Sequence, residues 1–305
     1  RCGDHANIGM RSIDVPTSTA GAYPSRHQPV HAGSYVELPS AAWPTGDFTF
    51  QCSIWPTLPG DSEQALMANW DASAGLGYAL ILDQDGAVAL RIGDGEEVRT
   101  VSTGTPTLPR HWYQVVASFD ATNKTVRVAQ RAITRYAADP TSAAVCEAVN
   151  IAPSDGPGLR IAAWHASAAP CHHCATLLAG GYYNGKLEAP MAAACALSAE
   201  DVDGLMARGS LHTLANLQGH WDFSRDIDNT KIVDVSPHQR HGEAVNLPTR
   251  AMKGRHWDGS EYNWSHKPEH YGAIHFHDDD LYDAGWDTDF SFDVPTDLAS
   301  GLYCA

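Results

Sequence analysis

The densest group of potential metal ligands is "HFHDDD", residues 275–280. Alternate side chains of an extended strand share a face, so His275 and His277 would point the same way as Asp279. Two imidazoles and one carboxylate in this arrangement can form a facial site for a mononuclear metal ion. The aspartates also fit an acidic turn at a strand end, where carboxylates accept backbone hydrogen bonds. We favour this structural interpretation, or a domain junction, over a metal site.

A second group of potential ligands is "CHHC", residues 171–174. Four consecutive residues cannot all close around one tetrahedral zinc ion, so Cys171 and Cys174 would need a second pair of ligands. The sequence has no other C-x-x-C, and nothing in the spacing of Cys146 or Cys195 requires either of them to contribute. We therefore expect a surface loop between strands.

Signatures of common enzyme classes are missing from the sequence. There is no G-x-S-x-G, no P-loop and no G-x-G-x-x-G, so serine hydrolase, nucleotide and dinucleotide functions lack their usual support. Glu188 and Glu200 have no acidic partner at a spacing that suggests a glycosidase pair. Four tryptophans could stack on a sugar, but each is more simply explained as part of the core or rim of a β-sandwich: Trp43, Trp55, Trp70 and Trp112.

The net charge and the cysteine content limit the possible binding partners and the cellular compartment of the protein. The net charge of -16 disfavours binding to nucleic acid and to anionic membrane surfaces, so we expect neither as a partner. No segment is apolar for long enough to span a bilayer. Seven cysteines spread over 305 residues favour a reducing, cytoplasmic compartment over a disulfide scaffold. Because the chain starts at Arg1 and stops after "GLYCA", we expect both ends to be cut from a longer parent.

The elements that would position these residues are mostly short strands. "FTFQCSIW" alternates, which places Phe48, Phe50, Cys52 and Ile54 on one face of a sheet. "YALILDQDGAVALRIGDG" predicts a hairpin that turns at Asp85-Gly86, and "HWYQVVASFDATNKTVRVAQ" predicts another that turns at residues 120–124. Strands and turns this closely spaced favour an antiparallel sandwich.

The second half of the chain is less regular. Composition predicts a loop or insertion over residues 137–158, followed by a strand in "GLRIAAWHAS". Ser198 and Asp201 form a capping box that opens one short, peripheral helix, which Gly209 should end. Residues 251–271 are rich in aromatic residues and histidines without periodicity, and we expect them to pack as an irregular linker.

Taken in order, the segments "GSYVELP", "FTFQCSIWP", "HWYQVVASFD" and "YYNGKLEAPMAAACALSAEDVDGL" resemble a laminin-G-like, concanavalin A-type jelly roll. In that family a strand with an N-G-K motif precedes a short helix, as at residues 184–186 and 197–202 here. Its usual first strand, W-x-F followed by D-x-S-x-x-x-x-H-G, comes late in this chain, at residues 221–223 and 234–242. The resemblance implies an all-β, antiparallel β-sandwich whose strand order is circularly shifted.

The tail "AIHFHDDDLYDAGWDTDFSFDVPTDLASGLY" and the opening "RCGDHANIGMRSIDVP" resemble the large (beta) subunit family of N,N-dimethylformamidase, and the similarity runs through the whole chain. The resemblance implies a jelly roll ahead of an α/β catalytic domain whose ferric iron is held by two tyrosinates and one glutamate. By position, Tyr303 is the candidate for the first tyrosinate, with the other ligands beyond Ala305. Without the resemblance, Tyr303 would be an ordinary core tyrosine.

These observations predict four regions: an N-terminal extension (1–29), a jelly-roll domain (30–250), a linker (251–271) and the first segment of a truncated catalytic domain (272–305). The resemblance implies hydrolysis of a small N-substituted formamide to an amine and formate, with most of the active site outside this chain. The implied partners are a small alpha subunit and further copies of the large subunit. The alternative is a lectin-like module that binds carbohydrate or protein and has no catalytic role.

Overall fold

The computed structural model describes residues 33–133, 141–166, 178–208, 216–278, 293 and 295–299. Its helices are α1 (Ala199–Arg208) and the 3-10 helix η2 (Pro268–Tyr271). Its strands are β1 (Tyr35–Glu37), β2 (Phe48–Pro56), β3 (Gln64–Asp71), β4 (Leu76–Leu82), β5 (Ala87–Asp94), β6 (Val98–Pro106), β7 (Tyr113–Asp120), β8 (Thr125–Ala132), β9 (Ala143–Ala148), β10 (Arg160–Ile161), β11 (Trp164–Ala166), β12 (Leu178–Gly180), β13 (Gly185–Ala193), β14 (Leu217–Asp222), β15 (Lys231–Asp234), β16 (Gly242–Val245), β17 (Thr249–Met252) and β18 (Ala273–Phe276).

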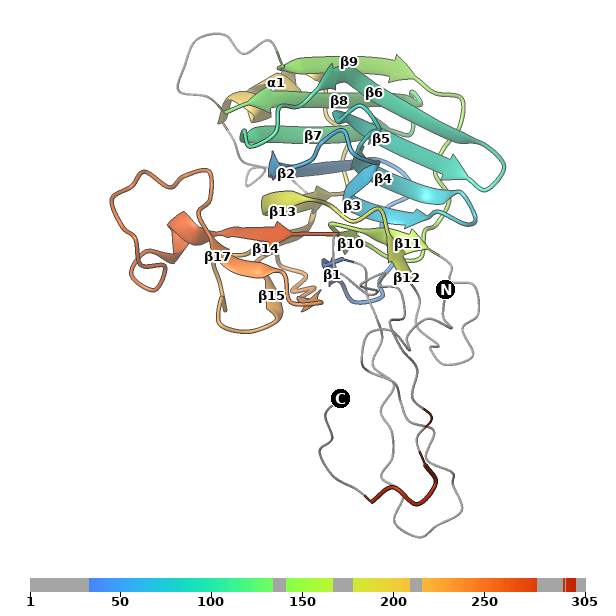
Figure 1. Ribbon diagram of the computed structural model, residues 1–305. Coiled ribbons are helices and arrows are strands. Elements are labelled where there is room, and N and C mark those ends of the chain that lie inside the picture. The colour runs from blue at the N-terminus through green and yellow to red at the C-terminus, as the bar shows by residue number, and fades with distance from the viewer. Residues whose placement is uncertain are drawn as a thin grey trace.

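The strands form the two layers of a jelly roll (Figure 1). One layer, which we call the helix-covered sheet, runs β9-β8-β7-β2-β13, and β18 and β14 share the far edge of β13. The opposite sheet runs β6-β5-β4-β3-β10-β1-β16-β15. The β14–β15 ladder joins the two layers at one side. Apart from the short β11–β3 contact, these ladders are antiparallel, which confirms the predicted fold class.

The core lies between the two sheets, where the alternation of β2 predicts it. Phe48, Phe50, Cys52 and Ile54 are fully or almost fully buried in the main apolar cluster. Burial raises the pKa of the Cys52 thiol far above its ordinary value, so this thiol stays protonated at neutral pH.

Both predicted hairpins are confirmed. The first joins β4 to β5, and Gly86 takes a positive φ of 80° at the turn. The carboxylate of Asp83 accepts the backbone N–H groups of Asp85 and Ala87 at 3.0 and 2.9 Å. The second hairpin joins β7 to β8 with Asp120 opposite Thr125. In both turns, a side chain before the turn satisfies backbone donors within it.

The chain after β8 departs from the prediction. Residues 137–158 were expected to form a loop or insertion, but Ala143–Ala148 form β9, which pairs antiparallel with β8 at the sheet edge. Four of the six β9 residues are exposed and two are half-buried. Because an exposed edge strand needs few apolar residues, its composition resembles that of a loop.

Helix α1 begins with the predicted capping box. The Ser198 hydroxyl accepts the backbone N–H of Asp201 at 3.1 Å, and the Asp201 carboxylate accepts the backbone N–H of Ser198 at 3.2 Å. The helix packs against β7 and β8 on the outer face of the helix-covered sheet (Figure 1). At its other end, Gln114 and Arg131 donate to the carbonyls of Leu205 and Met206, at 3.3 and 3.1 Å. Two of the last carbonyls of the helix are thereby satisfied by the sheet.

The W-x-F and D-x-S motifs meet at the β14–β15 ladder, where Trp221 lies opposite Asp234. The Asp234 carboxylate is 2% exposed and accepts the backbone N–H groups of His220, Ser236 and Arg240 at 2.9, 2.8 and 2.7 Å. The indole of Trp221 donates to the Arg240 carbonyl at 3.0 Å. Since these donors saturate the carboxylate, the motif serves to fold the turn rather than to bind a ligand.

The last two residues of that motif, His241 and Gly242, are explained by local contacts. The imidazole Nδ1 of His241 accepts the backbone N–H of Asp234 at 3.1 Å. A Cβ at Gly242 would lie 2.6 Å from Leu38 and 2.8 Å from Val36. Only glycine therefore lets β16 approach β1 this closely.

Candidate functional site

The outer face of the helix-covered sheet carries a second cover, residues 253–271, which we call the 253–271 loop. It connects β17 to β18 and includes η2, and Figure 1 shows it in orange, projecting beside β17. Beneath it lie the outward-facing residues of the N-terminal half of β13 and its neighbour β2, because Lys186 pairs with Trp55 and Glu188 with Ser53. On this surface, three of the cation-π contacts of the described residues lie close to the buried carboxylate of Glu188.

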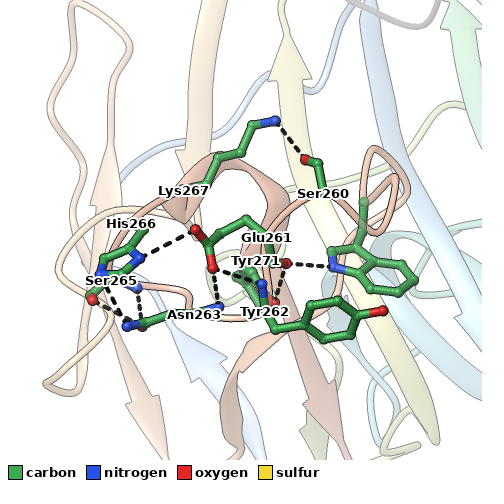
Figure 2. Close-up of polar contacts among 9 residues, drawn as sticks. Ser260, Glu261, Tyr262, Asn263, Ser265, His266, Lys267 and Tyr271 are labelled. Carbon is green, nitrogen blue, oxygen red and sulfur yellow. Dashed lines mark hydrogen bonds and ion pairs between the residues drawn. The ribbon is translucent and has the colours of Figure 1, made fainter.

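The loop is built around Glu261, at the centre of Figure 2. Its carboxylate accepts the backbone N–H groups of Tyr262 and Asn263, each at 2.8 Å, and lies 3.2 Å from Nδ1 of His266. Its backbone carbonyl accepts the indole N–H of Trp257 at 3.1 Å and the hydroxyl of Tyr271 at 2.8 Å. The Asn263 N–H and the His266 imidazole hold the pKa of Glu261 below its usual range. The loop therefore has a defined conformation of its own.

A second acidic residue of the loop, Asp258, is also engaged. Hydrogen bonds from the Ser260 side chain and backbone lower its pKa to about 2, and Lys267 and His270 add to the shift. The Nδ1 atom of His270 lies 3.5 Å from one Asp258 oxygen, and Nζ of Lys267 lies 4.0 Å from the other. Asp258 is thus ionised and already neutralised within the loop.

Glu188 and Arg255 anchor the loop to the sheet. The Glu188 side chain is buried, and its carboxylate accepts the backbone N–H of Arg255 at 2.7 Å. Burial raises the pKa of Glu188, and the Arg255 N–H and guanidinium partly oppose that rise. The guanidinium also donates to the Ser53 hydroxyl at 3.0 Å. A Cβ at Gly254 would lie 2.7 Å from a Glu188 oxygen, so glycine is required where the loop crosses this carboxylate.

Two ammonium groups next to this anchor rest on aromatic rings. Nζ of Lys186 lies 4.4 Å from the ring centroid of Trp55. Nζ of Lys253 lies 3.8 Å from the ring of Trp257 and 5.1 Å from that of Tyr262. Burial and the charge of Lys253 lower the pKa of Lys186. In chemical terms, this surface offers cations and aromatic faces, which suits binding of an anionic group.

The histidines of "HFHDDD" lie where the chain leaves the sandwich. His275 is in β18, opposite Lys186 of β13, and the buried Phe276 separates it from His277. The backbone of His277 pairs with Ser34, whose N–H donates to the His277 carbonyl at 2.8 Å. Within the described ranges, no group of three histidine, cysteine or acidic side chains could hold a metal ion.

The same exit point holds the first aspartate of the motif. The side chain of Asn184 donates to the Asp278 carboxylate, and the backbone N–H of Asp278 donates back to Asn184 at 3.3 Å. A Cβ at Gly33 would lie 2.5 Å from the His277 carbonyl oxygen, so the strands that enter and leave the sandwich are in direct contact. Several predicted site residues lie outside the described residues: Asp279, Cys171, Cys174 and Tyr303.

The tryptophans considered for sugar stacking divide into two kinds. Trp43 and Trp70 are buried, at 5% and 4% exposure. Trp55 and Trp112 are half-buried, and Trp55 is the one that lies under the ammonium group of Lys186. Sequence reasoning missed the residues that form the cationic surface: Lys186, Lys253, Arg255, Trp257 and Tyr262. Lysine is scarce in the sequence, and two of the five lysines, Lys253 and Lys267, fall within the 253–271 loop, which is the one signal that could have revealed this surface.

Two family models match the chain. Residues 31–130 match the concanavalin A-like lectin/glucanases superfamily, and residues 249–305 match the family described as N,N-dimethylformamidase beta subunit-like, C-terminal. With the sheet order above, the first match defines the class: an all-β, concanavalin A-like sandwich with one short helix. A putative carbohydrate binding protein from Bacteroides ovatus superposes with a TM-score of 0.46 at 13% identity, over 70% of this chain and 56% of that chain.

Over 98% of its length, the chain is 33% identical to the N,N-dimethylformamidase beta subunit of Paracoccus aminophilus and 32% identical to that of Alcaligenes sp. The chain is thus N,N-dimethylformamidase beta subunit-like, with a laminin-G-type sandwich in its N-terminal region, and the predicted resemblance is confirmed. It spans 41% of the length of each of these relatives.

Proposed function

We propose that this chain is the N-terminal portion of an amidohydrolase that resembles N,N-dimethylformamidase and hydrolyses small N-substituted formamides to an amine and formate. The observation that supports the proposal is the 33% identity to the beta subunit over nearly the whole chain. Because the chain spans 41% of that relative, we assign most of the active site to residues outside it.

The iron of this proposal is not assigned to the sandwich. The described residues hold no group of three histidine, cysteine or acidic side chains suited to a metal ion, and we derive no catalytic step from them. The proposed ligand in this chain is Tyr303, which lies outside the described residues. Its role remains a prediction based on the position of the "SGLY" segment.

In this proposal the sandwich is a scaffold that carries the catalytic region and makes subunit contacts. Its exit at His277 and Asp278 is fixed by Ser34 and Asn184, which gives the segment that follows a defined starting point. The relatives are named as beta subunits, and we extend to this chain a small alpha subunit and further copies of itself as partners. We assign the assembly to the cytoplasm. In the described part of the chain, no helix is long and apolar enough to cross a membrane.

The test is an assay of the full-length parent with dimethylformamide, following release of dimethylamine and formate. We expect hydrolysis, together with a visible tyrosinate-to-iron absorption band. The Tyr303→Phe variant should lose both the band and most of the activity. The Tyr262→Phe variant is the matched control, since this tyrosine is 74% exposed on the 253–271 loop and should retain both.

Two results would count against the proposal. A parent that hydrolyses formamides at full rate after all iron is removed would rule out the iron-dependent form. A parent that shows no amidase activity but binds specific glycans on an array would favour the lectin-like alternative.

A further inference from the structure

The lysines of the chain fall into two groups. The sequence has five, and two of them form ion pairs: Lys231 lies 3.6 Å from the Asp226 carboxylate, and Lys267 lies 4.0 Å from that of Asp258. Lys124 donates to the Asn150 carbonyl at 3.1 Å, and Lys186 donates to the Lys253 carbonyl at 3.5 Å. Lys186 and Lys253 form no ion pair with any described carboxylate, although the chain has 36 acidic residues. Both lie on aromatic rings instead.

The acidic groups nearest to these two lysines already have partners. Glu188 is buried and bound to the backbone of Arg255. Glu261 accepts two backbone N–H groups of the loop, and Asp258 accepts the backbone N–H of Ser260 at 2.8 Å and lies 4.0 Å from Nζ of Lys267. No other described carboxylate is thus placed to neutralise Lys186 or Lys253.

The surroundings of the two lysines are electropositive. The proximity of Lys253 contributes to the lowered pKa of Lys186, after burial. Burial, followed by the charges of Arg255 and His270, lowers the pKa of His256 on the same loop. An anion bound here would gain from several cations at once.

The aromatic side chains next to these cations are unusually exposed. Tyr262 is 74% exposed, while Trp257 is half-buried against Tyr262 with ring planes at 80°. Tyrosine and tryptophan are enriched at the centre of protein–protein interfaces. This area extends beyond what a small carboxylate could cover.

We propose that Lys186, Lys253, Trp257 and Tyr262 form a docking site for an acidic segment of a partner polypeptide. Carboxylates of the partner pair with the two ammonium groups, and its apolar atoms pack on the two rings. Charge complementarity favours a polypeptide over a nucleic acid, because the net charge of -16 repels an extended phosphate backbone while a short acidic segment meets only the local cations. The site does not depend on the proposed amidase activity.

The experiment measures the fluorescence anisotropy of a fluorescein-labelled octaglutamate peptide on titration with the full chain. We expect saturable binding that weakens as salt is added. The double variant Lys186→Gln/Lys253→Gln should weaken binding by at least about tenfold. The matched control, Lys124→Gln/Lys231→Gln, removes the same charge from lysines outside this aromatic surface, and should change binding less than about twofold.

A further variant keeps the test valid if the double variant folds poorly. Tyr262→Ser changes an exposed side chain, so it should leave the thermal unfolding midpoint unchanged and still weaken peptide binding several-fold. Equal losses in the two double variants would overturn the proposal, because only net charge would then matter. If acetate at the same concentration displaced the peptide completely, the surface would be a site for a small carboxylate instead. Tighter binding of a labelled oligothymidine than of the peptide would show a nucleic-acid site.

Discussion

The outer face of one sheet carries two covers of opposite chemistry. Helix α1 lies over one part of it and contributes Val202, Leu205 and Met206 to an apolar cluster with Val116 and Met191. The 253–271 loop lies over the other part and is attached through a buried carboxylate and a guanidinium. The outer face of one sheet can therefore be covered in two ways. Apolar packing tolerates small changes in geometry, whereas a polar network depends on every one of its hydrogen-bonding groups.

The largest expected effect tests the apolar cover. Leu205→Ala removes a side chain that is 2% exposed and should lower the free energy of unfolding by about 3 kcal/mol. Urea denaturation followed by circular dichroism measures this. Leu247→Ala, at a position 79% exposed, is the control and should stay within about 0.5 kcal/mol of the wild type. A loss below about 1 kcal/mol at Leu205 would mean that α1 contributes little to stability.

A smaller effect tests the polar cover. Glu188→Ala leaves the buried Arg255 backbone N–H without its acceptor and removes the negative charge beside the guanidinium, and should destabilise the chain by about 2 kcal/mol. Glu188→Gln keeps a carbonyl oxygen for the backbone donor and should cost about 1 kcal/mol or less. Urea denaturation of both variants at neutral pH measures the difference. Equal effects of alanine and glutamine would show that packing, rather than the hydrogen bond, holds the loop.

The smallest effect concerns pH. Burial raises the pKa of Glu188, so between the ordinary glutamate pKa and this raised value the native state binds more protons than the unfolded state. The contribution of Glu188 to stability therefore falls as pH rises through that window. Relative to Glu188→Gln, the wild type should lose unfolding free energy as pH rises above about 4.5. A difference that stays constant from acid to neutral pH would contradict this assignment.

The sequence predicted the parts of the fold that depend on local patterns. The alternation in β2, the Asp85-Gly86 turn and the Ser198 capping box each involve residues within a few positions of one another, and each is confirmed. The edge strand β9 was missed because exposed strands lack an apolar pattern. The sheet pairing also agrees with the predicted antiparallel jelly roll, whereas the circular shift of its strand order stays a prediction.

The cationic surface could not be predicted in the same way. Glu188 and Arg255 are 67 residues apart, and Lys186 meets Trp55 only because β13 pairs with β2. Such contacts follow from strand order, which local patterns do not specify. The proposed ligand Tyr303 depends on the family resemblance alone, since a tyrosine in an apolar stretch is ordinarily a core residue.

The contact between Ser34 and His277 brings the first and last described strands of the sandwich together at one point. These two residues are 243 positions apart in the sequence, so the chain that forms the sandwich begins and ends at almost the same place. A short glycine-rich linker from Gly33 to Asp278 could replace all the residues between them without stretching the backbone on either side. The sandwich should therefore also tolerate circular permutation, in which its original ends are joined and new ends are opened at an exposed turn such as residues 121–124.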